Sequence, residues 1–343
     1  MSGGSEANPL RVHFLALVAV AALGSACALA PAAAAPQPAP TPTLPCPVAA
    51  GSPPPLASAS APPPAAPRPT EPAPPSPALK AALEAATKAT AVADWAGADK
   101  HLAVATTAAA DDPHLAYLVA RVRATRFVTA GDLESASAAF VAVMPSLAGH
   151  PELRDEFWAH NAMMMIREAQ GDPAGALAEN DQATLCAARG TWDDEERESL
   201  AFQKDRWHRA YLTRMLAESR TGAAKRALIQ YAEAALADYR TRGFGESVAV
   251  LEAYFASLDG KRDAAVAAAR RVDPSKDDDV EDLYLVVVGL EAGGDHAGAE
   301  AVRRVMRRPG APSISRAIML RWLDADARTT QPRTFTPWHA TAR

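Results

Sequence analysis

The ten residues Glu168-Ala-Gln-Gly-Asp-Pro-Ala-Gly-Ala-Leu177 contain the pattern that decides the fold. Gly171 is a turn residue, and the small residue Ala176 follows it five positions later. A glycine can adopt positive φ and end one helix. An alanine at this distance then lets the next helix pack closely against the one before it. The stretch therefore predicts a helical hairpin.

The same offset occurs in five further places along the chain. They are Ala93/Ala98, Gly131/Ala136, Gly222/Ala227, Gly260/Ala265 and Gly294/Ala299, the first with alanine in place of the glycine. Successive turns are 38, 40, 51, 38 and 34 residues apart. No segment shows sustained alternation of β-branched residues, so strands are not expected. We therefore expect an all-α fold in which about six helical hairpins stack as a repeat solenoid over residues 78–328.

This period, with small residues at each hairpin contact, resembles that of the tetratricopeptide-repeat family. The fragments that carry the resemblance are Asp94-Trp95-Ala96-Gly97-Ala98 and the Gly-Asp-x-x-x-Ala copies that begin at Gly131, Gly171 and Gly294. The family repeats about every 34 residues, and one of the five intervals has this length. The Trp/Leu/Gly/Tyr signature of the family is absent from the first helices of the hairpins. The resemblance is thus to a degenerate, tetratricopeptide-like form. It implies a non-enzymatic module that presents a groove to another protein or peptide.

Two features refine the expected helices. Asp193, with Glu196 three residues later, has the spacing of a capping pair at the start of the fourth hairpin. After Pro312, a last helix over about residues 313–327 is expected to cap the final hairpin, as solenoids require. Residues 329–343 are expected to form a frayed C-terminal tail.

Residues 1–27 have the features of a bacterial export signal. Arg11 precedes an apolar run from Phe14 to Leu23, which is followed by Gly-Ser-Ala-Cys27. This ending resembles the lipobox of bacterial lipoproteins, although Leu23 lies one place earlier than the pattern requires. We expect lipidation at Cys27. Cleavage without lipidation and an uncleaved membrane anchor are the alternatives, and all three place the bulk of the protein outside the cytoplasm.

Residues 28–77 are expected to be a disordered Pro/Ala-rich linker. Nineteen of the 29 prolines lie between Pro31 and Pro77, with only Arg68 and Glu71 as charged residues. Such a composition cannot offset the entropy lost on ordering the backbone. The linker is interpreted either as a tether that holds the helical domain away from a membrane or as filler without a selected length.

Few residues suggest chemistry, and the sequence predicts no catalytic residue, no cofactor and no metal site. Glu156 and His160 share a helix face, but a metal site needs a third ligand that the sequence does not indicate. Cys186 is expected to be a small buried residue. The acidic run Asp277-Asp-Asp-Val-Glu-Asp282 lacks the glycine and ligand spacing of a calcium loop, so it is expected to favour a helix N-terminus.

One candidate partner contact comes from the long interval between Gly171 and Gly222. Its extra residues place Trp192 at a protruding tip, where an exposed tryptophan suggests a binding hot spot. The alternative is that Trp192 folds back over the next helix as a staple. Between Ala301 and Arg343 there are nine arginines and two acids, which form either a docking surface or a solvated helix face.

The sequence thus favours a membrane-anchored lipoprotein that binds a protein or peptide partner in the cell envelope. A structural subunit of an assembly or secretion machine is one alternative, and a helical-repeat enzyme or carbohydrate-binding protein is another. The net charge of −5 gives no indication of nucleic acid as a partner.

Overall fold

The computed structural model describes residues 72, 74–109, 111–150, 154–190, 192–241, 245–276, 279–310 and 312–328. Within these ranges every regular element is a helix, as the sequence predicts. The expected signal sequence, the linker and the C-terminal tail lie outside the described residues, except for a few positions before α1. The elements are α1 (Pro77–Ala91), α2 (Trp95–Ala109), α3 (Pro113–Ala130), α4 (Leu133–Val141), α5 (Met144–Leu147), α6 (Asp155–Ala169), α7 (Pro173–Arg189), α8 (Asp194–Phe202), η3 (Gln203–His208), α9 (Arg209–Glu218), α10 (Gly222–Thr241), α11 (Gly245–Leu258), α12 (Arg262–Ala269), α13 (Val280–Gly293), α14 (His296–Met306) and α15 (Ile314–Arg328).

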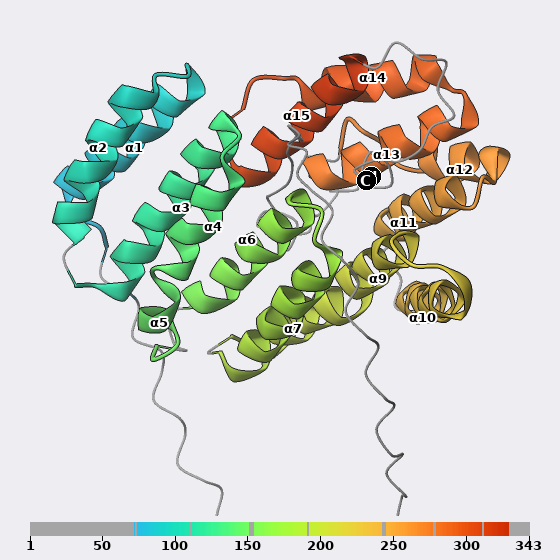
Figure 1. Ribbon diagram of the computed structural model, residues 1–343, viewed down its shortest axis with the longest axis horizontal. Helices are drawn as coiled ribbons and strands as arrows, with labels where there is room; N and C mark the ends of the chain where they lie inside the picture. Colours follow the sequence, from blue (N-terminus) through green and yellow to red (C-terminus); the bar gives the residue numbers. More distant parts are fainter. Residues whose placement is uncertain are drawn as a thin grey trace, which may run out of the picture. The chain divides into compact units, whose positions relative to one another are not determined.

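Consecutive helices pack against each other in pairs (Figure 1). The pairs are α1 with α2, α3 with α4, α6 with α7, α9 with α10, α11 with α12 and α13 with α14. Each pair also contacts a neighbouring pair through helices such as α3, α6 and α13. In the described part of the chain, most contacts between hairpins therefore join pairs that follow each other in sequence.

One local motif makes most of these turns. Gly131 ends α3 with φ 92°, and Asp132 follows as the N-cap of α4, accepting a hydrogen bond from the Ser135 backbone N at 2.9 Å. Ala136, the fourth residue of α4, is fully buried. The same order of left-handed residue, N-cap and buried alanine occurs at Ala93-Asp94/Ala98, Gly171-Asp172/Ala176, Gly260-Lys261/Ala265 and Gly294-Asp295/Ala299. This position requires a small residue because its side chain faces the preceding helix.

The fourth hairpin departs from the expected register. Gly222 has φ 60°, but it is the first residue of α10 rather than the residue that ends the preceding helix. Ala227 is exposed, so the prediction that it faces the preceding helix is wrong. The described buried residues of α10 begin later, at Ala232. No aspartate follows Gly222, although the turn at Gly260 keeps the expected register without one.

The long interval before Gly222 is taken up largely by helix. Asp193 accepts a hydrogen bond from the Glu196 backbone N at 2.7 Å, which confirms the predicted cap. From there α8, η3 and α9 run without a break to Glu218, and η3 is a π-helical turn. A π-turn holds more residues per turn than an α-helix. This hairpin therefore has a longer first helix than the others.

Helices α6 and α13 are buried on nearly all sides. Twelve of the 15 residues of α6 and 11 of the 14 residues of α13 are buried. By contrast, α14 buries three of its 11 residues. A helix with as few exposed residues as α6 or α13 is covered on almost every face. Helices α6 and α13 are thus the central elements of the main core, and α14 is a peripheral one.

The last helix does more than the predicted cap. Helix α15 packs on α13, and it also packs on α3 and α6, which precede it by more than 140 residues (Figure 1). Its buried residues Ile318 and Met319 belong to the main core, and the Trp322 ring lies 4.8 Å from the Tyr284 ring. The predicted contact with the final hairpin is thus present, and α15 covers two earlier helices as well. Helix α15 joins the late hairpins to the early ones.

The first hairpin has a separate small core, formed by α1, α2 and one side of α3 and centred on Leu79 and Leu102. Its apolar residues are mostly alanines, and its contacts run to α3. In the described part of the chain no helix is both long and apolar enough to cross a membrane.

Candidate functional site

A cleft of about 740 Å³ opens where α15 begins. Its walls come from the end of α1, the length of α3, the first three turns of α6, the segment around Trp192 and residues 312–314. Ligand sites are commonly concave and fall in the range of about 300–1,000 Å³. The cleft is of that size.

Aromatic rings form one wall of the cleft. Trp192 packs edge-to-face on Phe157 with a centroid distance of 5.2 Å, and its ring is 6.5 Å from that of Trp158. The Arg154 guanidinium lies 4.5 Å from the Trp192 ring centroid, close enough for a cation–π interaction. These contacts hold Trp192 in place, and 4% of its surface is exposed. The expectation of a protruding tryptophan tip is therefore wrong.

Trp192 folds back, but the rings that it packs on belong to Phe157 and Trp158 of α6, an earlier helix than the one that the alternative interpretation named. Sequence length alone could not show this, but the adjacent aromatic pair Phe157-Trp158 is a signal of an apolar surface that a tryptophan could cover. The predicted partner contact at Trp192 stays a prediction, because Trp192 also lines the cleft.

Most charges in the cleft are paired. The Nδ1 atom of His114 lies 2.7 Å from a carboxylate oxygen of Asp155, and this hydrogen bond raises the pKa of His114. Burial raises the pKa of Asp155, against the effect of His114. Arg154 makes an ion pair with Glu196 at 3.0 Å. Arg121 is exposed and lies 6.0 Å from the Tyr117 ring, and it makes no ion pair with a described carboxylate.

Two polar atoms of cleft residues lack partners. The hydroxyl of Thr90 and the indole N–H of Trp192 are buried, and neither has a hydrogen-bond partner among the described residues. A buried polar atom without a partner costs about 1–3 kcal/mol. Both atoms are buried, whereas the guanidinium of Arg121 is exposed and gives the cleft a positive charge that a ligand can reach.

Behind the cleft lies a buried polar network. Asn161 lines the cleft and accepts a hydrogen bond from the Nζ atom of Lys204, which is fully buried on η3. Burial lowers the pKa of Lys204. Tyr211 donates to Glu168, and burial raises the pKa of Glu168 to about 8. Lys204 does not line the cleft, because Asn161 lies between the cleft and the Lys204 side chain.

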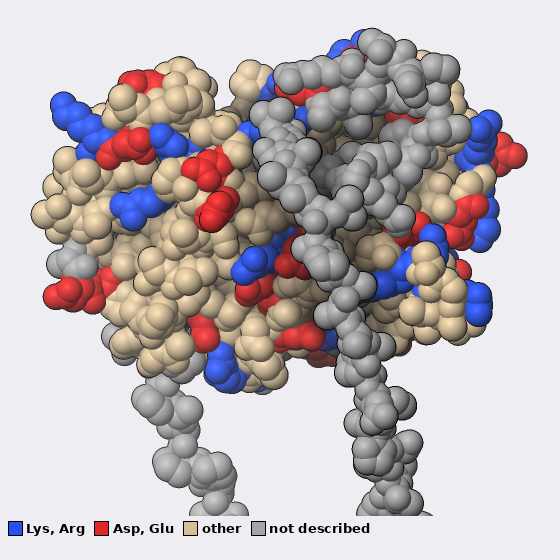
Figure 2. All heavy atoms as spheres, in the orientation of Figure 1, with Lys and Arg blue, Asp and Glu red and all other residues tan. Residues whose placement is uncertain are grey.

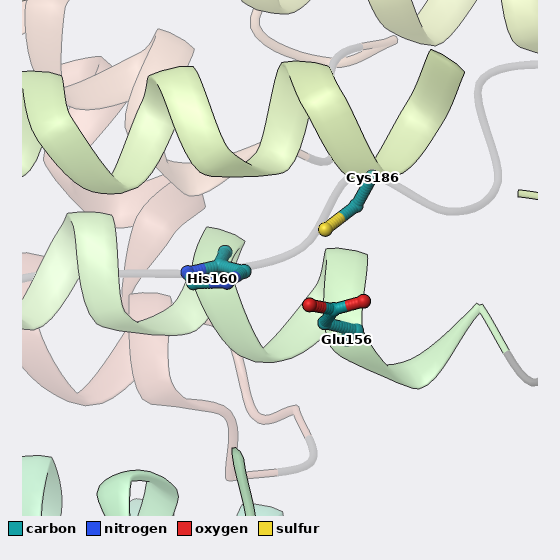
Figure 3. Close-up of side chains that lie close together, drawn as sticks. All are labelled: Glu156, His160 and Cys186. Carbon is teal, nitrogen blue, oxygen red and sulfur yellow. The ribbon is translucent and has the colours of Figure 1, made fainter. Parts of the chain in front are cut away.

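Three potential metal ligands lie together between α6 and α7 (Figure 3). Glu156 and His160 are one helical turn apart on α6, and Cys186 points toward them from α7. Ligand atoms of the three side chains lie within 4.8 Å of one another. Cys186 is buried, as expected, but the sequence analysis missed it as the third ligand. The antiparallel packing of α6 and α7 creates this proximity, and no local pattern indicates it.

Several of the remaining candidate residues have structural partners, and others lie outside the described ranges. Arg303 is ion-paired with Glu291 at 2.6 Å, and Arg307 is ion-paired with Asp324 at 3.3 Å. Asp279 caps α13, accepting from the Glu281 backbone N at 2.9 Å. Residues 277–278 and Cys27 are not among the described residues. Basic and acidic side chains are interspersed on the face shown in Figure 2.

Comparison with known proteins adds no family. The chain matches no protein-family model, no curated protein and no solved structure. The function proposed below therefore depends on the residues and their geometry.

Proposed function

We propose that this protein is a non-enzymatic binding module that holds a segment of another envelope protein in the cleft between α3 and α6. On this proposal the helical hairpins form a degenerate, tetratricopeptide-like solenoid. The recurrence of the left-handed residue, the N-cap and the buried alanine at five turns supports a repeated unit. Solenoids of this kind bind partners on surfaces formed by successive repeats.

The observation that carries the proposal is the exposed positive charge beside the apolar lining of the cleft. Arg121 offers a guanidinium that makes no ion pair with a described carboxylate. A carboxylate of a bound peptide would pair with it. Tyr117, Leu118 and Trp158 supply apolar area for a neighbouring side chain. The preferred ligand is therefore a short peptide segment with an acidic group beside an apolar residue.

The proposed location follows from the N-terminal sequence. Lipidation at Cys27 would anchor the chain in a bacterial membrane, and residues 28–77 would act as the tether. The partner is then a protein or peptide of the cell envelope. Nucleic acid is not proposed, because the chain has a net charge of −5 and the charges on the visible face are mixed (Figure 2).

The enzyme and carbohydrate-binding alternatives have less support. Both would be favoured by acids that converge in the cleft and remain available to a substrate. The acids that line it are Asp155 and Glu196, and each already has a basic partner. A structural subunit of an envelope machine remains the alternative that shares the same partner class.

Site-specific photo-crosslinking tests the proposal. A photoreactive residue at Leu118, in the cleft, should capture one defined envelope protein, whereas the same residue at exposed Val104 on α2 should not. Arg121→Glu should reduce the capture at position 118 several-fold, because it reverses the unpaired charge. The matched control is Arg226→Glu, at an exposed position on α10 away from the cleft. Equal capture from both crosslinking positions, or no effect of Arg121→Glu, would contradict the proposal.

A further inference from the structure

The cluster between α6 and α7 brings together three different kinds of metal ligand. Glu156 contributes a carboxylate, His160 an imidazole and Cys186 a thiol, from two packed helices (Figure 3). No other group of three or more His, Cys, Asp or Glu side chains in the described ranges lies as close together. Helices α6 and α7 are one of the most closely packed pairs of the protein, so the ligands stand on a rigid support.

The geometry needs little adjustment to hold a metal ion. Zinc bonds to nitrogen, oxygen and sulfur are about 2.0–2.3 Å long, so ligand atoms around a tetrahedral zinc are roughly 3.5 Å apart. The three ligand atoms here lie within 4.8 Å of one another. Side-chain rotations can close a gap of about 1 Å without moving either helix.

His160 is already oriented by a carboxylate. Its Nδ1 atom lies 2.7 Å from an Oε2 atom of Glu179, on α7. A histidine that donates its Nδ1–H to a carboxylate presents the lone pair of Nε2, which is the usual arrangement of metal-binding histidines. His114 and His296 also contact carboxylates, but neither belongs to a described cluster that includes a thiol.

The positively charged guanidinium of Arg189 lies between two of the ligands, Glu156 and Cys186. The Nη2 atom of Arg189 is 3.0 Å from both carboxylate oxygens of Glu156 and 3.1 Å from the sulfur of Cys186. Arg189 ends α7, and 53% of its side chain is exposed. The guanidinium therefore occupies a position suited to a cation, and it has room to leave toward the solvent.

We propose that Glu156, His160 and Cys186 form a site for one Zn²⁺ ion, and that Arg189 occupies the cation position when the metal is absent. The ligand types favour zinc, since Mg²⁺ and Ca²⁺ prefer sites made only of oxygen. On binding, the Cys186 thiol loses its proton to solvent and the thiolate sulfur bonds to the metal. Three protein ligands leave a fourth position for water or another ligand.

Cobalt substitution of the full chain, purified without a histidine tag, tests this site. Added Co²⁺ should produce the thiolate-to-cobalt charge-transfer absorption in the near ultraviolet, and Zn²⁺ should abolish it by competition. Cys186→Ala should lose the absorption, whereas Cys46→Ala should keep it. His160→Ala should weaken binding at least about tenfold, a typical scale for a lost metal contact. His296→Ala, the control that removes another carboxylate-paired histidine, should bind as the wild type does.

Arg189→Ala distinguishes a metal site from a structural ion pair. If the guanidinium competes with the metal, its removal should increase the affinity for Co²⁺ several-fold. Circular dichroism of each variant shows whether it folds. If Cys186→Ala does not fold, the Zn²⁺-induced rise in melting temperature of the wild type is compared with that of His160→Ala, which should be smaller at the same Zn²⁺ concentration. Absence of the absorption in the wild type, or its persistence in Cys186→Ala, would overturn the proposal.

Discussion

Ala93 holds a backbone conformation that glycine holds at the equivalent turns. Its φ is 58°, in the left-handed region, whereas Gly171 has φ 73° at the turn between α6 and α7. The hydrogen bonds of the two turns correspond: Ala93 N donates to Thr90 O, as Gly171 N donates to Glu168 O. Ala93 thus has the backbone conformation that Gly171 has at its turn, and glycine adopts this conformation without steric strain. Ala93→Gly should therefore stabilise the protein.

The expected change in the free energy of unfolding is the difference between two opposing effects. The left-handed conformation costs a residue with a Cβ about 1–2 kcal/mol. Glycine in turn loses about 0.4–1 kcal/mol more conformational entropy on folding than alanine. Ala93 is exposed, so its methyl group contributes little packing. The expected net gain is about 0.5–1 kcal/mol in the free energy of unfolding.

Two further variants serve as controls for this prediction. Gly171→Ala should lose a similar amount, because a Cβ added there meets no atom within 4 Å and only the backbone term changes. Ala142→Gly makes the Ala93 change at an exposed residue with φ −65°, so it should destabilise instead. Urea denaturation measures the global effect. The first hairpin has its own small core, so hydrogen exchange of the α1 and α2 amides measures the local one. If Ala93→Gly destabilises as Ala142→Gly does, the reasoning on the turn is refuted.

Four further predictions follow from packing, burial and the N-terminal motif. Ala176→Phe should cost about 1–3 kcal/mol of stability and lower the melting temperature, whereas Ala178→Phe should be mild, because Ala176 is fully buried and Ala178 is exposed. Trp192→Ala should cost about 3 kcal/mol in urea denaturation, the low end for a buried tryptophan; a loss below about 1 kcal/mol would instead favour a partner contact. Glu168 is protonated in the folded state up to about pH 8 but titrates near 4.5 when unfolded, so its contribution is full below pH 4.5 and is lost as the pH rises toward 8. The unfolding free energy of Glu168→Gln should therefore fall less than that of the wild type across this range. Cys27→Ser should leave an unprocessed precursor that incorporates no labelled fatty acid, and unchanged labelling would exclude lipidation at Cys27.

The helical class and most turns could be predicted because their causes are local. A left-handed residue, an aspartate N-cap and a small residue four positions into the helix are read within six residues, as at Gly294-Asp295/Ala299. The same reasoning failed at Ala227, where the glycine lacks the aspartate after it. Gly260 also lacks a following aspartate, yet Ala265 is fully buried, so the missing aspartate does not by itself explain the failure at Ala227.

The parts of the candidate sites that could not be predicted depend on contacts between distant segments. Cys186 meets Glu156 only because α7 folds back along α6. Trp192 is buried because Phe157 and Trp158 offer it a surface some 35 residues earlier in the chain. An insertion length gives the number of extra residues, but it does not give the direction in which they fold.

The position of the cleft follows from where the covering helix starts. Helices α3 and α6 have buried faces that a further helix must cover. Helix α15 packs on both of them from Ile314 onward. At residues 312–314 the helix is only beginning, so the first turns of α6 keep an open side, where Asp155 and Asn161 line the cleft. A ligand seated there touches α3, α6 and the start of α15 at once. On the proposed function, binding therefore stabilises the contact that joins the two ends of the helical region, and the removal of α15 weakens binding even though most of the cleft is formed by other helices.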